Sequence, residues 1–200
     1  LEESLCKWFA KKIGFNDFSG GIAASGGTLS NLNALIAARN NAGLGTNPNS
    51  VLLVSEDAHS SFVKCIRVMG LDTRNLVRIK TDNQGRMDIN DLRNSLDKCS
   101  IENKKIFAIV ATLGTTVRGA IDPIKEISEI CKQRNIWLHI DGSIGGIFAI
   151  TSIPIEGLNN INQANSITIN PQKIIGITKT SSLLLVSNMS TLENTFNTGL

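Results

Sequence analysis

Short apolar runs that alternate with segments of helical periodicity restrict the possible folds of this chain more than any other feature. The run at residues 106–111 is unbroken, which is typical of a strand buried on both faces of a parallel sheet. Further strands are expected at residues 51–54, 76–79, 136–140, 166–169 and 181–186. Helices are expected at residues 1–13, 29–41, 62–69, 89–98 and 122–134. This alternation predicts an α/β fold with a mostly parallel sheet flanked by helices.

Several helix boundaries carry local signals. Asp88 is expected to cap the helix that follows it, and the pair Asp122-Pro123 predicts a cap followed by proline in the first turn. The first helix is expected to end at Gly14. Its apolar stripe is expected to contain Leu1, Leu5, Trp8 and Phe9. Residues 20–28 are interpreted as a glycine-rich loop and residues 159–165 as a polar surface loop.

Composition excludes several classes of protein. The 200 residues suffice for one sizeable domain, and 42% hydrophobic with 18% charged residues is ordinary for a globular protein. The net charge is only +3 and the basic residues are scattered, so we expect neither a nucleic-acid nor a membrane partner. Four cysteines without a CxxC pair indicate neither a metal site nor a disulfide framework, which favours a reducing cytoplasm.

Groups able to do chemistry follow the predicted strands. Ligands of α/β sheets bind beyond the carboxyl ends of the strands, so side chains at those ends should converge. The loop at residues 25–28 can reach the same edge. The groups expected there are His59, Thr116, Asp141 and Lys173.

Lys173 follows an apolar strand and is flanked by apolar residues. Partial desolvation there would free the amine lone pair for attack on a carbonyl, as a Schiff-base lysine requires. Alternatively, its stem is buried and its ammonium simply reaches water. The loop at residues 25–28 precedes a helix N-terminus, where unpaired N–H groups favour a phosphate. It lacks the P-loop and GxGxxG patterns, and a turn needed only for backbone geometry is the alternative.

The remaining polar groups also admit two interpretations. Asp141 is either a cap at the sheet edge or the partner of a bound cation, such as a protonated pyridine nitrogen. His59 could stack on an aromatic ring or move a proton, or it could be an ordinary structural histidine. His139 is assigned a structural role, because its side chain should point away from Ile140 and take no part in the duty of Asp141.

Five ordered motifs together resemble one family, the group II pyridoxal-phosphate-dependent amino-acid decarboxylases, which include the glutamate, aromatic amino-acid and diaminobutyrate enzymes. The resemblance covers nearly the whole chain and implies the large domain of fold type I, with a mostly parallel seven-stranded sheet flanked by helices. The matching stretches are residues 25–31 with 37–39, 58–61, 111–116, 136–141 and 170–173.

The resemblance implies pyridoxal 5'-phosphate as cofactor and an L-amino acid as small-molecule substrate. Lys173 would form the Schiff base, Asp141 would pair with the pyridine nitrogen and His59 would stack over the ring. The remaining cofactor-binding residues implied are Gly27 and Thr28 at the phosphate with Asn170 near it, Thr116 beside the ring, and Ser143 under it. Gln172 would either hydrogen-bond near the phosphate or substrate carboxylate, or only position the turn before Lys173.

Three positions depart from the family pattern: Gln172 stands where most members have His, Ile144 replaces an aromatic residue, and Asn165 replaces Asp. The resemblance also implies a longer homodimeric protein, in which residues 1–200 are the cofactor-binding large domain. An N-terminal segment, a small C-terminal domain and a mobile loop with a catalytic tyrosine would complete it. The absence of Tyr from this chain fits a fragment.

Two other functions remain open at this stage. The motif residues also suit other enzymes of the same fold, such as carbon–carbon or carbon–sulfur lyases or aminotransferases. A non-catalytic binding or scaffold fragment is the alternative from a different class, although such a fragment would need neither Lys173 nor Asp141.

Overall fold

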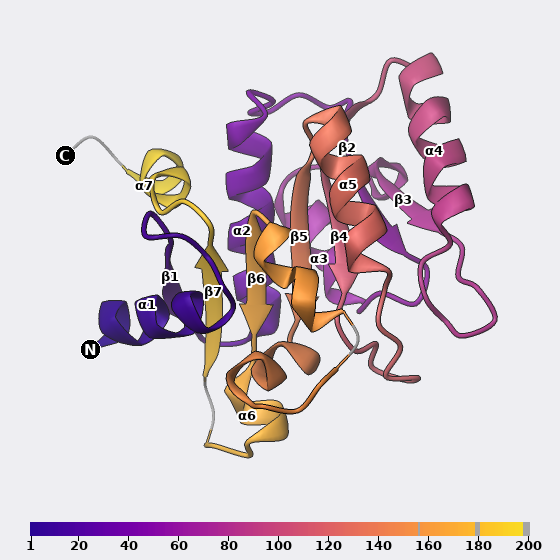
Figure 1. Ribbon diagram of the computed structural model, residues 1–200. Coiled ribbons are helices and arrows are strands. Elements are labelled where there is room, and N and C mark those ends of the chain that lie inside the picture. Colours follow the sequence, from indigo (N-terminus) through magenta and orange to yellow (C-terminus); the bar gives the residue numbers. More distant parts are fainter. Residues whose placement is uncertain (156, 179–180, 198–200) are drawn as a thin grey trace.

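The computed structural model describes residues 1–155, 157–178 and 181–197, and it contains a seven-stranded sheet (Figure 1). The sheet order is β1-β7-β6-β5-β4-β2-β3, and β7 is antiparallel to both of its neighbours, whereas the pairs from β6 to β3 are parallel. The predicted α/β fold with a mostly parallel sheet is therefore confirmed. The strands are β1 (Gly20–Ala24), β2 (Ser50–Ser55), β3 (Leu76–Ile79), β4 (Lys105–Thr112), β5 (Trp137–Gly142), β6 (Ser166–Ile169) and β7 (Ser182–Val186).

Helices cover both faces of this sheet. The α-helices are α1 (Glu2–Lys12), α2 (Gly27–Asn41), α3 (Ser61–Val68), α4 (Ile89–Ile101), α5 (Ile124–Arg134), α6 (Pro171–Ile174) and α7 (Ser190–Phe196). Three 3-10 helices are η1 (Thr73–Asn75), η2 (Gly145–Ile150) and η3 (Leu158–Gln163). One core unites α1, α4 and α5 with one face, while α2, α3 and α7 pack on the other. No helix within the described ranges is both long and apolar enough to cross a membrane.

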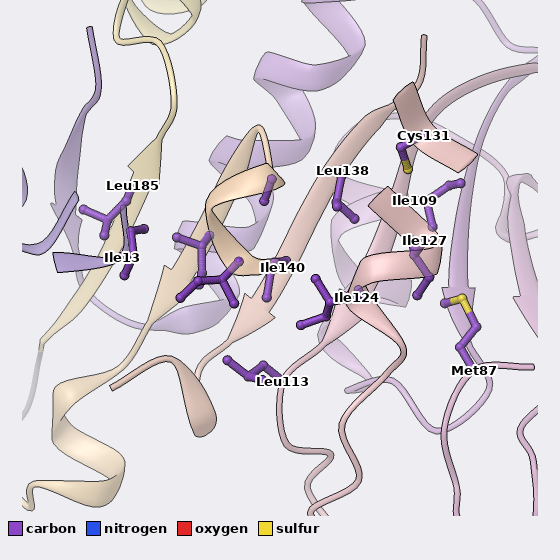
Figure 2. Packing of buried hydrophobic residues seen from close by; sticks show 14 of the residues in the cluster. Ile13, Met87, Ile109, Leu113, Ile124, Ile127, Cys131, Leu138, Ile140 and Leu185 are labelled. Carbon is purple, nitrogen blue, oxygen red and sulfur yellow. The ribbon is translucent and has the colours of Figure 1, made fainter. Parts of the chain in front are cut away.

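The larger core lies between the sheet and α5 (Figure 2). Ile109 of β4 and Leu138 and Ile140 of β5 belong to the same buried cluster as Ile124 and Ile127 of α5. Burying each such side chain contributes about 1.5–3 kcal/mol. Alternate residues of β4, such as Ala108 and Val110, point to the opposite face, toward α2 and α3, which explains why this strand is apolar on both sides.

Strand β1 was not predicted, because its sequence Gly-Gly-Ile-Ala-Ala lies in the stretch interpreted as a loop. Its pairing with β7 overrides the low strand propensity of glycine. A Cβ on Gly21 would lie 2.3 Å from the backbone oxygen of Leu184, so the close approach of these two strands requires glycine here. The glycine-rich loop is therefore shorter than expected, and α2 begins at Gly27.

The apolar stripe predicted for α1 is wrong in most of its members. Leu1, Leu5 and Trp8 are exposed. The buried face instead consists of Cys6, Phe9 and Ala10, continued by Ile13. These positions follow the i, i+3, i+4, i+7 spacing of a helix face, displaced by one residue from the predicted stripe. Trp8 stays at the surface, where its ring forms a T-shaped pair with that of Phe9 and the Lys12 ammonium lies 5.6 Å from its centre.

Asp122 precedes α5 as predicted, but it does not cap that helix. The helix is preceded by Pro123, and no side chain caps it. The buried Asp122 carboxylate instead accepts backbone hydrogen bonds from Met87 and Thr112, each at 2.7 Å. Burial raises its pKa to about 6, although both N–H bonds favour the charged form. Asp122 therefore joins two segments far apart in the sequence.

The polar stretch at residues 159–165 is only partly a surface loop. It contains most of η3, and its residues Ile161 and Ala164 are buried. The side-chain oxygen of Asn165 accepts the Leu138 N–H at 2.8 Å. An amide oxygen can accept this bond as a carboxylate would, so the departure from Asp at this position preserves the contact.

Candidate active site

The carboxyl ends of β1, β5 and β6 meet at one edge of the sheet. Since β7 is antiparallel to both β1 and β6, these two strands run in the same direction. The loop after β1 and the helix α6 after β6 therefore lie at the same edge, with α6 at the bottom of Figure 1. This is the edge at which α/β sheets bind their ligands.

A cavity of about 560 Å³ lies at this edge and collects eight of the nine predicted site residues. Thr116 does not line it and lies exposed in the turn after β4. The cavity also contains residues that the sequence did not single out for a role, including Asn31 and Ser61. The predicted residues that line it are Gly27, Thr28, His59, Asp141, Ser143, Asn170, Gln172 and Lys173.

One wall of the cavity is the N-terminus of α2, a helix of 15 residues. Gly26 precedes it and no side-chain cap occupies its first N–H groups. A Cβ on Gly27 would lie 2.7 Å from Asn170 Nδ2 and 2.8 Å from Ser143 Oγ. Only glycine therefore lets these two polar groups approach the helix terminus, and the resulting cradle suits an anion such as phosphate.

Asn170 is oriented by a chain of hydroxyl groups behind it. Its Oδ1 accepts a short hydrogen bond from Ser182 Oγ, which lies 2.7 Å from Ser30 Oγ. All three residues are buried. Because the amide oxygen is occupied, the Nδ2 donor is the group turned toward Gly27 and the anion cradle.

Asp141 supplies the opposite charge preference. It is 5% exposed, and its Oδ1 accepts the Ser143 N–H while its Oδ2 accepts the Asn31 amide, both at 3.1 Å. Among the described residues, no lysine or arginine forms an ion pair with it. A buried carboxylate without a counter-charge favours a cationic ligand.

His59 and Lys173 lie at the mouth of the cavity, and both are exposed. The Nδ1 of His59 accepts the Ser61 N–H at 3.2 Å, which places the ring at the start of α3. Lys173 belongs to the single turn of α6 and not to the strand end, and its backbone N–H donates to the backbone oxygen of Asn170 at 3.0 Å. The expected partial burial of Lys173 is therefore wrong for this chain.

Gln172 connects α6 to the start of β7, because its Oε1 accepts the Ser181 N–H at 3.0 Å. This contact supports the interpretation in which Gln172 positions the turn. Gln172 also lines the cavity, so a role toward a ligand stays a prediction.

Asn31 and the connection of His139 to Asp141 were missed. Asn31 is buried and donates to Asp141 Oδ2, and its own Oδ1 lies 3.0 Å from His139 Nε2. His139 is fully buried and does not line the cavity, in keeping with a structural role, but it is connected to Asp141 through Asn31. A signal existed, since Asn31 shares a helix stripe with Leu35 and Ala38, and a polar residue on a buried stripe needs partners.

A second cavity, of about 650 Å³, lies beside the residues that precede α4 and α5 and includes Asp122. None of the predicted site residues lines it. The convergence of polar groups, rather than size, therefore identifies the smaller cavity as the candidate active site.

This fold and site define a class of α/β protein that offers an anion cradle, a buried carboxylate and a lysine at one sheet edge. The chain matches the model of the pyridoxal-dependent decarboxylase conserved domain over residues 1–199, and it belongs to that family. The family predicted from the five motifs is therefore confirmed.

Several known relatives are similar over most of the chain. An aromatic-L-amino-acid decarboxylase from Bacillus atrophaeus is 30% identical over 98% of this chain and 41% of its own length. The acidic amino acid decarboxylase GADL1 from Mus musculus is 33% identical over 96% of this chain and 36% of its own. The crystal structure of mouse CSAD in apo form is 31% identical, with a TM-score of 0.91, over 97% of this chain and 42% of that one. This chain thus spans less than half the length of these relatives.

Proposed function

We propose that this chain is the cofactor-binding part of a pyridoxal-phosphate-dependent carboxy-lyase, which converts an L-amino acid to its amine and CO2. The observation that carries the proposal is the single cavity in which an uncapped helix N-terminus, a buried carboxylate and a lysine converge. Family membership and the decarboxylase relatives support the same reaction class.

The residues present fit pyridoxal phosphate at both of its charged ends. The N–H groups of Gly27 and Thr28 would hold the phosphate together with Asn170 Nδ2, at the positive end of the α2 dipole. At the other end Asp141 would hold the proton of the ring nitrogen. A side chain at Gly27 would collide with Asn170 and Ser143, so glycine at this position leaves the cradle open for an oxyanion.

When bound, the cofactor supplies an electron sink for the pair left by the departing carboxylate. Lys173 would supply the amine that its aldehyde requires, and His59 would lie over the ring with Ser143 beneath it. Asp141 would keep the ring nitrogen protonated, so that the ring accepts electrons. Thr116 beside the ring and Gln172 near the phosphate or substrate remain part of the proposal.

We also propose that the substrate class is L-amino acids and that the full-length protein is a homodimer in the cytoplasm. The named relatives act on aromatic and on acidic amino acids at nearly equal identity, so the side-chain preference needs a substrate panel. Support for a partner surface comes from Ile174, Ile175 and Ile177, which leave about half of their side chains exposed next to Lys173. Support for a reducing compartment comes from the four free, buried cysteines.

The test is cofactor labelling in the full-length protein. Borohydride reduction of the protein loaded with pyridoxal phosphate should fix the cofactor on the peptide that contains Lys173. Lys173→Arg should abolish labelling and decarboxylation of a panel of acidic, basic and aromatic amino acids. Lys125→Arg, a change of an exposed lysine on α5, should alter neither. Label on another lysine, or none on the wild-type protein, would refute the assignment.

A further inference from the structure

Five buried side chains form a continuous series of hydrogen bonds that ends on Asp141. Trp137 Nε1 donates to Ser166 Oγ at 2.8 Å, and Ser166 Oγ lies 2.8 Å from His139 Nδ1. His139 Nε2 lies 3.0 Å from Asn31 Oδ1, and Asn31 Nδ2 donates to Asp141 Oδ2 at 3.1 Å. Each residue is at most 6% exposed, and of the five only Asn31 and Asp141 line the cavity.

The direction of donation follows from the carboxylate at the end of the series. A carboxylate only accepts, so Asn31 must turn its NH2 group to Asp141 and its oxygen to His139. His139 must then carry its proton on Nε2, which leaves Nδ1 to accept from the Ser166 hydroxyl. The Ser166 oxygen in turn accepts the Trp137 N–H. All four hydrogen bonds of the series thus run in one direction, from Trp137 to Asp141.

The series stabilises Asp141 through hydrogen bonds from neutral groups and places no positive charge beside it. Burial lowers the pKa of His139 to about 4, even though the nearby Asp141 raises it, so the imidazole is neutral near pH 7. A charged imidazolium would balance the carboxylate and weaken its attraction for a second cation. With His139 neutral, the negative charge of Asp141 remains for a ligand in the cavity.

We propose that Asn31 and His139 are positioning residues, which orient Asp141 and reserve its charge for the ring nitrogen of the cofactor. This inference rests on the proposed function, since it assumes that pyridoxal phosphate occupies the cavity. Neither residue would contact the substrate. Their loss should therefore lower kcat with little change in KM.

The experiment measures the ring-nitrogen proton directly, in the full-length protein loaded with pyridoxal phosphate labelled with 15N in the ring. The wild-type chemical shift should be that of a protonated pyridine. Asn31→Leu and His139→Leu should move it toward the unprotonated value and lower kcat about 10- to 100-fold, as for a lost hydrogen bond to a charged group. His139→Gln retains an N–H donor toward Asn31 and should restore both the shift and most of kcat.

Ser30→Ala is the matched control, because Ser30 is a buried polar residue of the same helix that leads to Asn170 instead. It should weaken cofactor binding and leave the 15N shift of the bound cofactor unchanged. Wild-type shift and kcat in both leucine variants would overturn the inference alone. A wild-type protein without bound cofactor would overturn the proposed function, and the inference with it.

A second measurement keeps the inference testable if the leucine variants do not fold. In the cofactor-free wild-type protein with 15N-labelled histidine, His139 should show a protonated Nε2 and an unprotonated Nδ1. The His139→Gln variant assigns the signal. The opposite tautomer would contradict the direction of donation and overturn the inference.

Discussion

The buried carboxylate of Asp122 should make one part of the fold more stable in acid. Asp122 is 1% exposed, and its two oxygens accept the backbone N–H groups of Met87 and Thr112. Thr112 ends β4 and pairs with Asp141 of β5, so loosening of this contact would reach the candidate site. Desolvation raises the pKa of the carboxyl group from 3.8 to about 6.

The magnitude follows from this shift. A rise of about two pKa units corresponds to about 3 kcal/mol, since one unit is worth about 1.4 kcal/mol. The folded chain holds the proton more tightly than the unfolded chain, so protonation of Asp122 stabilises the fold. That stabilisation is fully present below pH 3.8 and is lost as the pH rises through about 6.

Hydrogen exchange read by mass spectrometry between pH 4 and 7 measures the free energy of local opening in the full-length protein. After correction for intrinsic rates, the wild-type opening free energy of the peptides containing Met87 and Thr112 should fall relative to Asp122→Asn as the pH rises. The asparagine offers one acceptor oxygen for two N–H groups. It therefore adds a loss of about 1–3 kcal/mol that does not depend on pH.

Asp72→Asn serves as the control. The hydrogen bond from the Arg74 side chain lowers the pKa of the exposed Asp72 below 3.8, so its contribution to stability is lost only as the pH falls below about 4. The difference in opening free energy between the wild type and Asp72→Asn should therefore stay nearly constant from pH 4 to 7. A wild-type minus Asp122→Asn difference that stays constant from pH 4 to 7 would mean that Asp122 has its ordinary pKa. The reasoning from burial would then be refuted.

Changes at three positions test the candidate site in the full-length protein. Gly27→Ala should raise the dissociation constant of pyridoxal phosphate about 5- to 150-fold, as for an overpacking cost of about 1–3 kcal/mol, and an unchanged value in equilibrium dialysis would contradict the cradle. Asp141→Ala should retain some cofactor but lower kcat at least about 100-fold, corresponding to about 3 kcal/mol, so normal turnover would exclude its proposed role. Gln172→Ala should weaken cofactor binding by about 0.5–1.5 kcal/mol, and Gln172→His should add an ionisation near neutrality to the pH–rate profile. If Gln172→Ala changes neither cofactor affinity nor turnover, Gln172 has no role toward the ligand.

The sequence predicted those elements whose signals are local. Apolar runs such as residues 106–111 and 136–140 became β4 and β5 with boundaries shifted by at most two residues. Strand β1 was missed because its pairing with β7, more than 150 residues away, determines its conformation. The stripe of α1 was misplaced for a similar reason, since the sheet selects Cys6 and Phe9 from several apolar residues.

The candidate site was predictable to the extent that it follows from the sheet-edge rule. That rule brought Asp141 and the loop after β1 together without any knowledge of register. The contact between Asn31 and Asp141 could not be predicted in this way, because it depends on how α2 crosses the sheet. The exposure of Lys173 likewise depends on α6, a single turn that is too short for hydrophobic periodicity to predict.

Helix α2 links the two ends of the candidate site through neighbouring residues. Ser30 contacts Ser182, which orients Asn170 at the anion cradle, whereas Asn31 contacts the buried carboxylate of Asp141 at the other end of the site. Successive helix residues point about 100° apart, so one turn of one helix reaches β7 and β5 at once. Because the N-terminus of the same helix also forms the anion cradle, the position of α2 sets the distance between the contacts proposed for the phosphate and for the ring nitrogen. A displacement of α2 would therefore weaken both ends together, whereas Ser30→Ala and Asn31→Leu should each affect one end.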